Sequence, residues 1–75
     1  MSIQETNKIN YRLKAIRASI GYSQWMLSNF TSISQSRISL IEKGHVKPSQ
    51  REKEKIVKAL DVSLEDIFPT ERSEK

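Results

Sequence analysis

Residues 33–44 read ISQSRISLIEKG, and this segment decides the fold. Ser34 can cap the free backbone N–H groups of a first helical turn. Ile33 and Ile38 are spaced as the two sides of a hydrophobic staple across that turn. Gly44 supplies the left-handed residue with which many helices end. The pattern therefore predicts a short helix between Ser34 and Gly44.

This predicted helix has two different faces. Ile38 and Ile41 share one face at 100° per residue, and a largely polar, singly charged set lies opposite: Ser36, Ser39, Leu40 and Lys43. Short polar side chains reach base edges in a DNA major groove without clashing. The segment is thus suited to lie in that groove, and we expect the rest of the chain to hold it in position.

The chain has 75 residues, enough for one small domain with a modest core. It contains no Cys and a single His, which excludes disulfides, thiolate metal sites and a zinc site. We therefore expect no metal and no cofactor. No segment resembles a signal peptide or a membrane span. We expect a cytoplasmic protein with one domain over residues 1–75, an ordered core over about residues 8–69 and flexible ends.

The net charge of +4 is unevenly distributed. Residues 1–51 contain eight Lys and Arg against two Glu, a net charge of +6, whereas residues 52–75 contain five basic and seven acidic side chains, a net charge of −2. The basic excess lies with the candidate groove helix, as expected for a phosphate-facing surface. A basic charge alone is equally common in small domains that bind no nucleic acid.

Two helices are predicted before residue 33. The first runs from about Lys8 to Ile20, with Thr6 or Asn7 as its cap and Gly21 at its end. Its buried stripe consists of Ile9, Leu13, Ile16 and Ile20.

The second helix is capped by Ser23 and runs to about Phe30 or Thr31. In it, Leu27 and Phe30 are expected to point to the core, with Trp25 opposite Leu27. A short turn over residues 31–33 follows, which gives a helix-turn-helix arrangement.

Two more helices are predicted after Gly44. Ser49 and Glu52 form a capping box for a helix over about residues 50–60. Ser63 caps a last short helix over about residues 64–68, and Pro69 stops it. No segment alternates as a strand does. The sequence predicts an all-α domain of five helices.

The chain resembles the Cro and phage-repressor type of helix-turn-helix regulator, also called the XRE or lambda-repressor-like family, from about Tyr11 to Phe68. The landmarks are Arg17, Gly21-x-Ser23-Gln24, Ile33-Ser34-Gln35-Ser36, Ile38, Ile41-Glu42-x-Gly44, Pro48-Ser49 and the segment from Ile56 to Leu64. The specificity of the match lies in the order and spacing of these pieces.

This resemblance implies a five-helix fold whose third helix reads the major groove. Gln35 would pair with an adenine edge, with Ser36 and Ser39 at neighbouring bases. The implied phosphate contacts are Gln24, which would also brace Gln35, together with Lys43, His45 and Lys47. Arg17 and Glu42 would form a structural ion pair.

The sequence also departs from the family pattern. Ser28 and Ser32 stand where the family usually has Ala and a turn Gly, so Ser32 either adopts a positive φ or the turn differs. Lys53 replaces a usual core leucine, so its aliphatic stem alone can cover the core. Leu40 occupies an outward groove position, where it either contacts a thymine methyl group or shifts the docking.

The roles of several residues stay open at this point. Arg37 is either a DNA-backbone contact or a solvated charge. Trp25 either packs against the first helix or the tail, or meets a phosphate or a partner protein. Leu64 and Phe68 are core residues or part of a homodimer interface, which binding to two half-sites requires.

We therefore expect a Cro-like repressor that regulates transcription, binds double-stranded DNA as a homodimer on a palindromic operator, and is not an enzyme. The alternative is a protein-interaction module such as an antitoxin, which exposed Trp25, Met26 and Leu40 would favour. An activator role is disfavoured because the second helix has no acidic residue. Phage or mobile-element immunity, restriction–modification control and antitoxins are equally open as biological settings.

Overall fold

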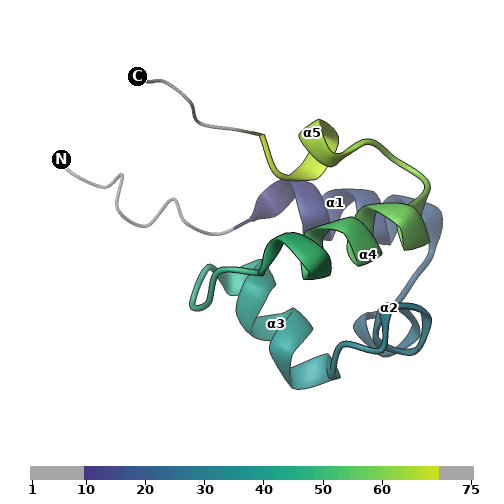
Figure 1. Cartoon of the computed structure of the whole chain (residues 1–75). Coiled ribbons are helices and arrows are strands. Elements are labelled where there is room, and N and C mark those ends of the chain that lie inside the picture. The colour runs from purple at the N-terminus through teal and green to yellow at the C-terminus, as the bar shows by residue number, and fades with distance from the viewer. Residues whose placement is uncertain (1–9, 70–75) are drawn as a thin grey trace, which may run out of the picture.

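The computed structural model describes residues 10–69, and this part of the chain contains five helices and no strand. The helices are α1 (Tyr11–Ile20), α2 (Gln24–Thr31), α3 (Gln35–Lys43), α4 (Gln50–Leu60) and α5 (Leu64–Ile67) (Figure 1). The all-α, five-helix prediction is confirmed, and α2 and α3 form the helix-turn-helix.

Helix α4 packs against α1, α2 and α5, and α1 packs in turn against α3 and α5. Helices α2 and α3 lie together below α4 in Figure 1, and α1 and α5 lie above and behind it. One apolar core joins all five helices and the turn before α3. Its buried members are Leu13, Leu27, Ile33, Ile38, Ile41, Ile56, Leu60 and Ile67.

The helix ends follow the local sequence signals. The hydroxyl groups of Ser23, Ser34 and Ser49 each accept a backbone N–H bond of 3.0–3.1 Å from the third residue of the helix they cap. Gly21 and Gly44 end α1 and α3 in the left-handed conformation, with φ of 91° and 79°.

Ser32 ends α2 with φ of 64°, so the turn keeps its shape although a side chain replaces the usual glycine. Of the two possibilities stated for this residue, the positive φ is therefore the one that the structure has.

The predicted start of α1 was wrong. The helix begins at Tyr11, and Asn10 is its cap, accepting the Leu13 N–H at 2.9 Å. Two bonds to other helices fix Asn10 in the cap position. Its backbone N–H donates to the carbonyl of Glu42 at 2.9 Å, and its side-chain amide donates to the carbonyl of Ile67 at 3.3 Å. The earlier positions proposed for the cap and first turn, residues 6–9, lie outside the described residues.

Two predicted core residues are exposed. The exposed fractions of Ile20 and Phe30 are 41% and 57%, and the Phe30 ring lies beside Tyr22 with centroids 5.1 Å apart. Arg17 and Thr31 occupy buried positions instead. The Thr31 hydroxyl donates to the carbonyl of Leu27 at 2.8 Å and accepts the Ile33 N–H at 3.2 Å, so this buried hydroxyl is hydrogen-bonded both as donor and as acceptor.

Candidate nucleic-acid interface

Helix α3 presents a mostly polar outer face. Ile38 and Ile41 are buried beneath it. The predicted base-reading residues share the outward side, where Gln35, Ser36 and Leu40 are exposed and Ser39 is half-buried. The structure thus brings together the four side chains that the sequence proposed for base recognition.

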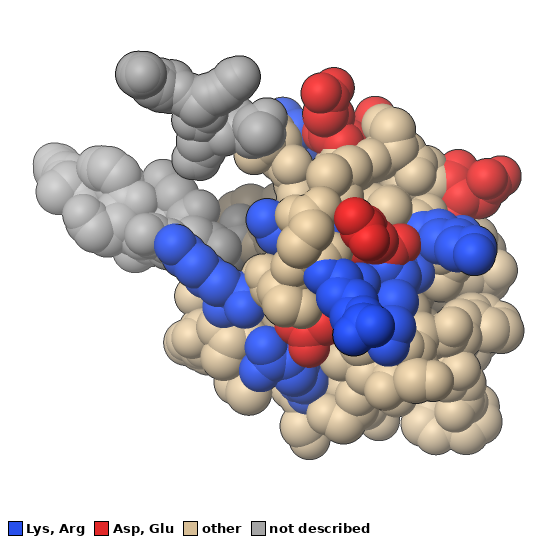
Figure 2. All heavy atoms as spheres, viewed as in Figure 1, with Lys and Arg blue, Asp and Glu red and all other residues tan. Residues whose placement is uncertain are grey.

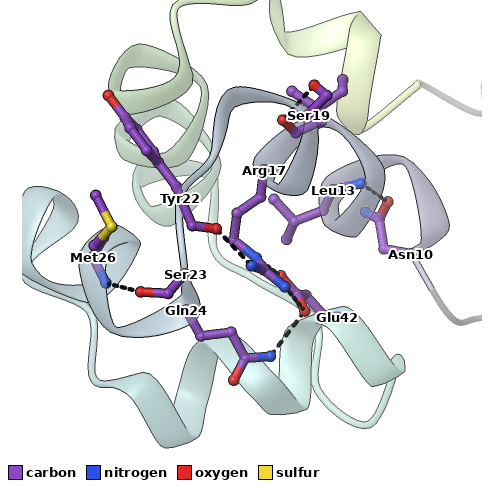
Figure 3. Close-up of polar contacts among 10 residues, drawn as sticks. Asn10, Leu13, Arg17, Ser19, Tyr22, Ser23, Gln24, Met26 and Glu42 are labelled. Atoms are coloured by element: carbon purple, nitrogen blue, oxygen red, sulfur yellow. Dashed lines mark hydrogen bonds and ion pairs between the residues drawn. The ribbon is translucent and has the colours of Figure 1, made fainter.

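An ion pair anchors the C-terminal end of α3 (Figure 3). Arg17 Nε lies 2.7 Å from Glu42 Oε2, and a second bond of 3.2 Å joins the guanidinium to Oε1. The same guanidinium donates to the carbonyl of Tyr22 at 2.7 Å. Both charged side chains are almost fully buried, which confirms the structural role expected for Arg17 and Glu42. The pair fixes α3 to α1 and to the α1–α2 connection.

Gln24, the first residue of α2, joins this network. Its side-chain amide donates to Glu42 Oε1 at 2.9 Å, as Figure 3 shows. The resemblance implied that Gln24 braces Gln35, and the structure places its amide on Glu42 instead. A carboxamide nitrogen has two hydrogens. The second remains available as a donor at the N-terminal end of α2.

A second ion pair joins the first turn of α3 to α4. Arg37 Nε lies 2.6 Å from Glu52 Oε2, and a second bond of 3.1 Å reaches Oε1. Glu52 also accepts the Ser49 N–H at 2.9 Å and so completes the capping box of α4. Arg37 is thus paired with Glu52 while 41% of its side chain stays exposed to solvent.

The electrostatics of this pair favour full ionisation. The hydrogen bond from Arg37, followed by the one from the Ser49 N–H, lowers the pKa of Glu52 to about 2. The same contact raises the pKa of Arg37. The sequence predicted Glu52 as a capping residue, but no local signal links it to a residue fifteen positions earlier.

The loop after α3 carries the other predicted phosphate contacts. Lys43, His45 and Lys47 are all exposed. The loop is fixed to α3, because the His45 N–H donates to the carbonyl of Leu40 at 2.9 Å. In Figure 2, Lys and Arg gather across the middle of the face that carries α4 and the end of α3, and Asp and Glu lie near α5, at the right edge and among these basic side chains.

The remaining candidates lie away from α3. Leu64 and Phe68, proposed for a dimer interface, are half-buried, and the Lys53 Nζ lies 5.7 Å from the centre of the Phe68 ring. Lys53 itself is half-buried. Trp25 is 62% exposed, so most of its side chain is left uncovered. The tail after residue 69, the other packing partner considered for it, lies outside the described residues.

Over residues 10–69, no group of three or more acidic, His or Cys side chains is placed to hold a metal ion. None of the five helices has the length and apolar character that a bilayer crossing requires.

Comparison with known proteins gives matches in both sequence and structure. A helix-turn-helix family model matches residues 13–67. An uncharacterized HTH-type transcriptional regulator of Bacillus subtilis (strain 168), YgzD, is 37% identical over 57 residues, which cover 76% of this chain and 86% of YgzD. The crystal structure of the restriction-modification controller protein C.AhdI from Aeromonas hydrophila superposes with a TM-score of 0.79 at 26% identity. That likeness covers 87% of this chain and 98% of C.AhdI.

The family match spans most of the chain and includes α2, α3 and the Arg17–Glu42 pair that anchors them. Proteins of this type are DNA-binding regulators and not enzymes. The chain belongs to the XRE-type helix-turn-helix family of transcriptional regulators.

Proposed function

We propose that this protein is a transcriptional repressor that binds a palindromic operator as a homodimer, with α3 in the major groove. The observation that carries this proposal is the construction of α3. Buried Ile38, Ile41 and Glu42 hold the helix from behind, and its polar face is exposed. An exposed polar face on a rigidly held helix is what direct readout in the groove requires.

Base recognition is assigned to four side chains of that face. Gln35, at the N-terminal end of α3, offers one donor and one acceptor and so fits the N6 and N7 groups of adenine. Ser36 and Ser39 reach the neighbouring bases. Leu40 is the apolar member of the face and fits against a thymine methyl group.

Backbone contacts are assigned to residues that flank this face. The second amide hydrogen of Gln24 donates to a phosphate at the start of α2. Lys43, His45 and Lys47 contact phosphates beyond the end of α3. Such contacts set the register of the protein on the duplex but carry no sequence information.

Dimerisation is assigned to the surface around Leu64 and Phe68. Two copies of α3 must be spaced by about one helical turn of DNA, roughly 34 Å, to read both half-sites. Sedimentation equilibrium tests this assignment. The wild-type chain is expected to dimerise, and Leu64→Asp is expected to be a folded monomer that binds the operator more weakly. A wild-type monomer at all concentrations, on and off DNA, would contradict it.

The likeness to C.AhdI supports one of the three settings that the sequence leaves open. C.AhdI is a restriction-modification controller protein. We propose the same setting here, in which the operator lies upstream of restriction–modification genes. Mapping the selected operator to promoters tests this, because an operator next to phage immunity genes or a toxin gene would favour another setting.

The experiment for the function itself is a selection of bound duplexes from a random pool at two salt concentrations. A palindromic consensus is expected, with binding that weakens as salt rises. Gln35→Ala should relax the preference at one base pair in each half-site and cost about 1–3 kcal/mol of discrimination. Asn29→Ala, which removes an exposed amide from α2, is the matched control and should leave the consensus unchanged.

A second candidate function is a protein-interaction module. Trp25 and Phe30 are both more than half exposed on α2, and the part of the molecule that carries α2 in Figure 2 shows few charges. Absence of retention of any duplex at either salt concentration would favour this function and rule out the operator-binding proposal.

A further inference from the structure

We propose that Glu52 acts as an intramolecular competitor of DNA phosphate for Arg37 and thereby lowers the sequence-independent affinity of the protein for DNA. This inference rests on the proposed function. It assigns to Glu52, a residue of α4 outside the groove-facing surface, a direct effect on how strongly α3 is attracted to the backbone.

The position of Arg37 makes it a natural phosphate ligand. It is the third residue of α3, in the same helical turn as Gln35 and Ser36, and backbone N–H groups at a helix N-terminus attract anions. Its side chain is 41% exposed, so the guanidinium lies at the surface. Arginine in such a place pairs well with a phosphate, because two parallel N–H groups match two oxygens.

Glu52 occupies that bidentate edge. Both of its carboxylate oxygens accept bonds from Arg37, at 2.6 and 3.1 Å. These bonds use two of the five N–H donors of the guanidinium. The remaining donors stay available, but the positive charge that would attract a phosphate is compensated.

Glu52 is also held in place independently of Arg37. It accepts the Ser49 N–H at 2.9 Å as part of the α4 capping box. The carboxylate is therefore presented by its own helix terminus. Because the Glu52 carboxylate is already fixed before DNA binds, it loses little further conformational entropy when it holds Arg37.

The test uses one substitution with a matched control. Glu52→Gln removes the charge while a glutamine can still complete the capping box. Glu54→Gln removes the same charge from an exposed position on α4, where the carboxylate is bonded to Gln50 at 3.3 Å. Arg37→Gln and the double variant Arg37→Gln/Glu52→Gln complete the set. Circular dichroism and urea unfolding confirm that each variant is folded.

The measurement is the affinity for a random-sequence duplex as a function of salt, because phosphate contacts do not depend on sequence. We expect Glu52→Gln to bind more tightly at low salt than the Glu54→Gln control. Its plot of log K against log salt should be steeper by about 0.9 per protein subunit, the slope of one added phosphate contact. Its advantage over the control should then fall roughly 3.5-fold between about 50 and about 200 mM salt. The double variant should return to the wild-type slope.

Three results would overturn the proposal. Equal slopes for Glu52→Gln and Glu54→Gln would show that Arg37 is not released. A double variant as steep as Glu52→Gln would show that the effect does not pass through Arg37. A slope lowered by about 0.9 in Arg37→Gln would show that Arg37 already contacts phosphate in the wild-type complex.

Failure of this inference is distinguishable from failure of the proposed function. If the wild-type chain binds no duplex at low salt, the proposed function fails and takes the inference with it. If the wild-type chain selects an operator and the four variants show no such differences, the function stands and only the competition between Glu52 and phosphate is refuted.

Discussion

The two ends of α3 are fastened by the same kind of pair in different surroundings. At the C-terminal end, Glu42 binds Arg17, and 5% and 11% of the two side chains are exposed. Near the N-terminal end, Arg37 binds Glu52, with 41% and 19% exposed. Removing one partner of a buried pair leaves an uncompensated charge, whereas solvent screens an exposed one. The first pair therefore maintains the fold, and the second is free to adjust binding.

The largest expected effect is at the buried end. Glu42→Ala leaves the Arg17 guanidinium buried without its carboxylate and should cost about 3–5 kcal/mol. A domain of this size has a total stability of roughly 4–11 kcal/mol, so the variant should lose between about a quarter and all of its stability. Urea unfolding followed by circular dichroism measures the loss. Glu54→Ala, on the exposed side of α4, is the control, and a similar loss in both variants would refute the comparison.

The next effect concerns the residue that ends α3. Gly44 has φ of 79°, where a side chain costs about 1–2 kcal/mol. Gly44→Ala should lower stability by that amount and also weaken DNA binding, because the loop with His45 and Lys47 follows directly. The unfolding midpoint and the affinity for a duplex should fall together. Unchanged stability would show that the backbone at this position relaxes.

A smaller change in stability, of opposite sign, is expected at Ser32 in the turn between α2 and α3. Ser32 holds φ of 64° with a side chain present. Ser32→Gly should therefore stabilise the domain by about 0.5–1 kcal/mol, after the greater flexibility of glycine in the unfolded chain is taken into account. Thermal unfolding should show a higher Tm. A lower Tm would mean that the Ser32 side chain contributes more than its strained backbone costs.

The smallest effect is the acid response of the exposed pair. The pKa of Glu52 lies near 2 in the folded protein, against an ordinary value of 4.5. Its stabilising contribution is present above about pH 4.5 and is lost as the pH falls toward 2. Between pH 4.5 and 2.5, wild-type stability should fall slightly more than that of Glu52→Gln. Parallel losses in the two proteins would indicate that other carboxylates dominate the acid response.

Much of this architecture is predictable because helix ends have local chemistry. The serine caps at positions 23, 34 and 49, the Ser49–Glu52 box and the two terminal glycines all act within one helical turn, and each prediction was confirmed. The outward face of α3 is predictable in the same way, because the spacing of Ile38 and Ile41 fixes which side of the helix is buried.

The predictions that were wrong depended on packing between helices. Asn7 and Asn10 are equivalent caps by local rules, and the bonds of Asn10 to Glu42 and Ile67 join separate helices, which local rules do not describe. Phe30 was placed in the core by its apolar character, but the Thr31 hydroxyl finds backbone partners and takes the buried position. The Arg37–Glu52 pair has no sequence signal at all, because an arginine on a helix flank has many possible partners.

The bonds of Asn10 have a topological consequence. This residue fastens the beginning of α1 to the end of α3 and to the last turn of α5, so the described chain forms a closed ring. A four-residue helix has no stability in isolation, so α5 depends on its bond to Asn10 and on the packing of Ile67 in the core. The domain is expected to open as one cooperative unit, so α3 should lose its place when α1 and α5 separate.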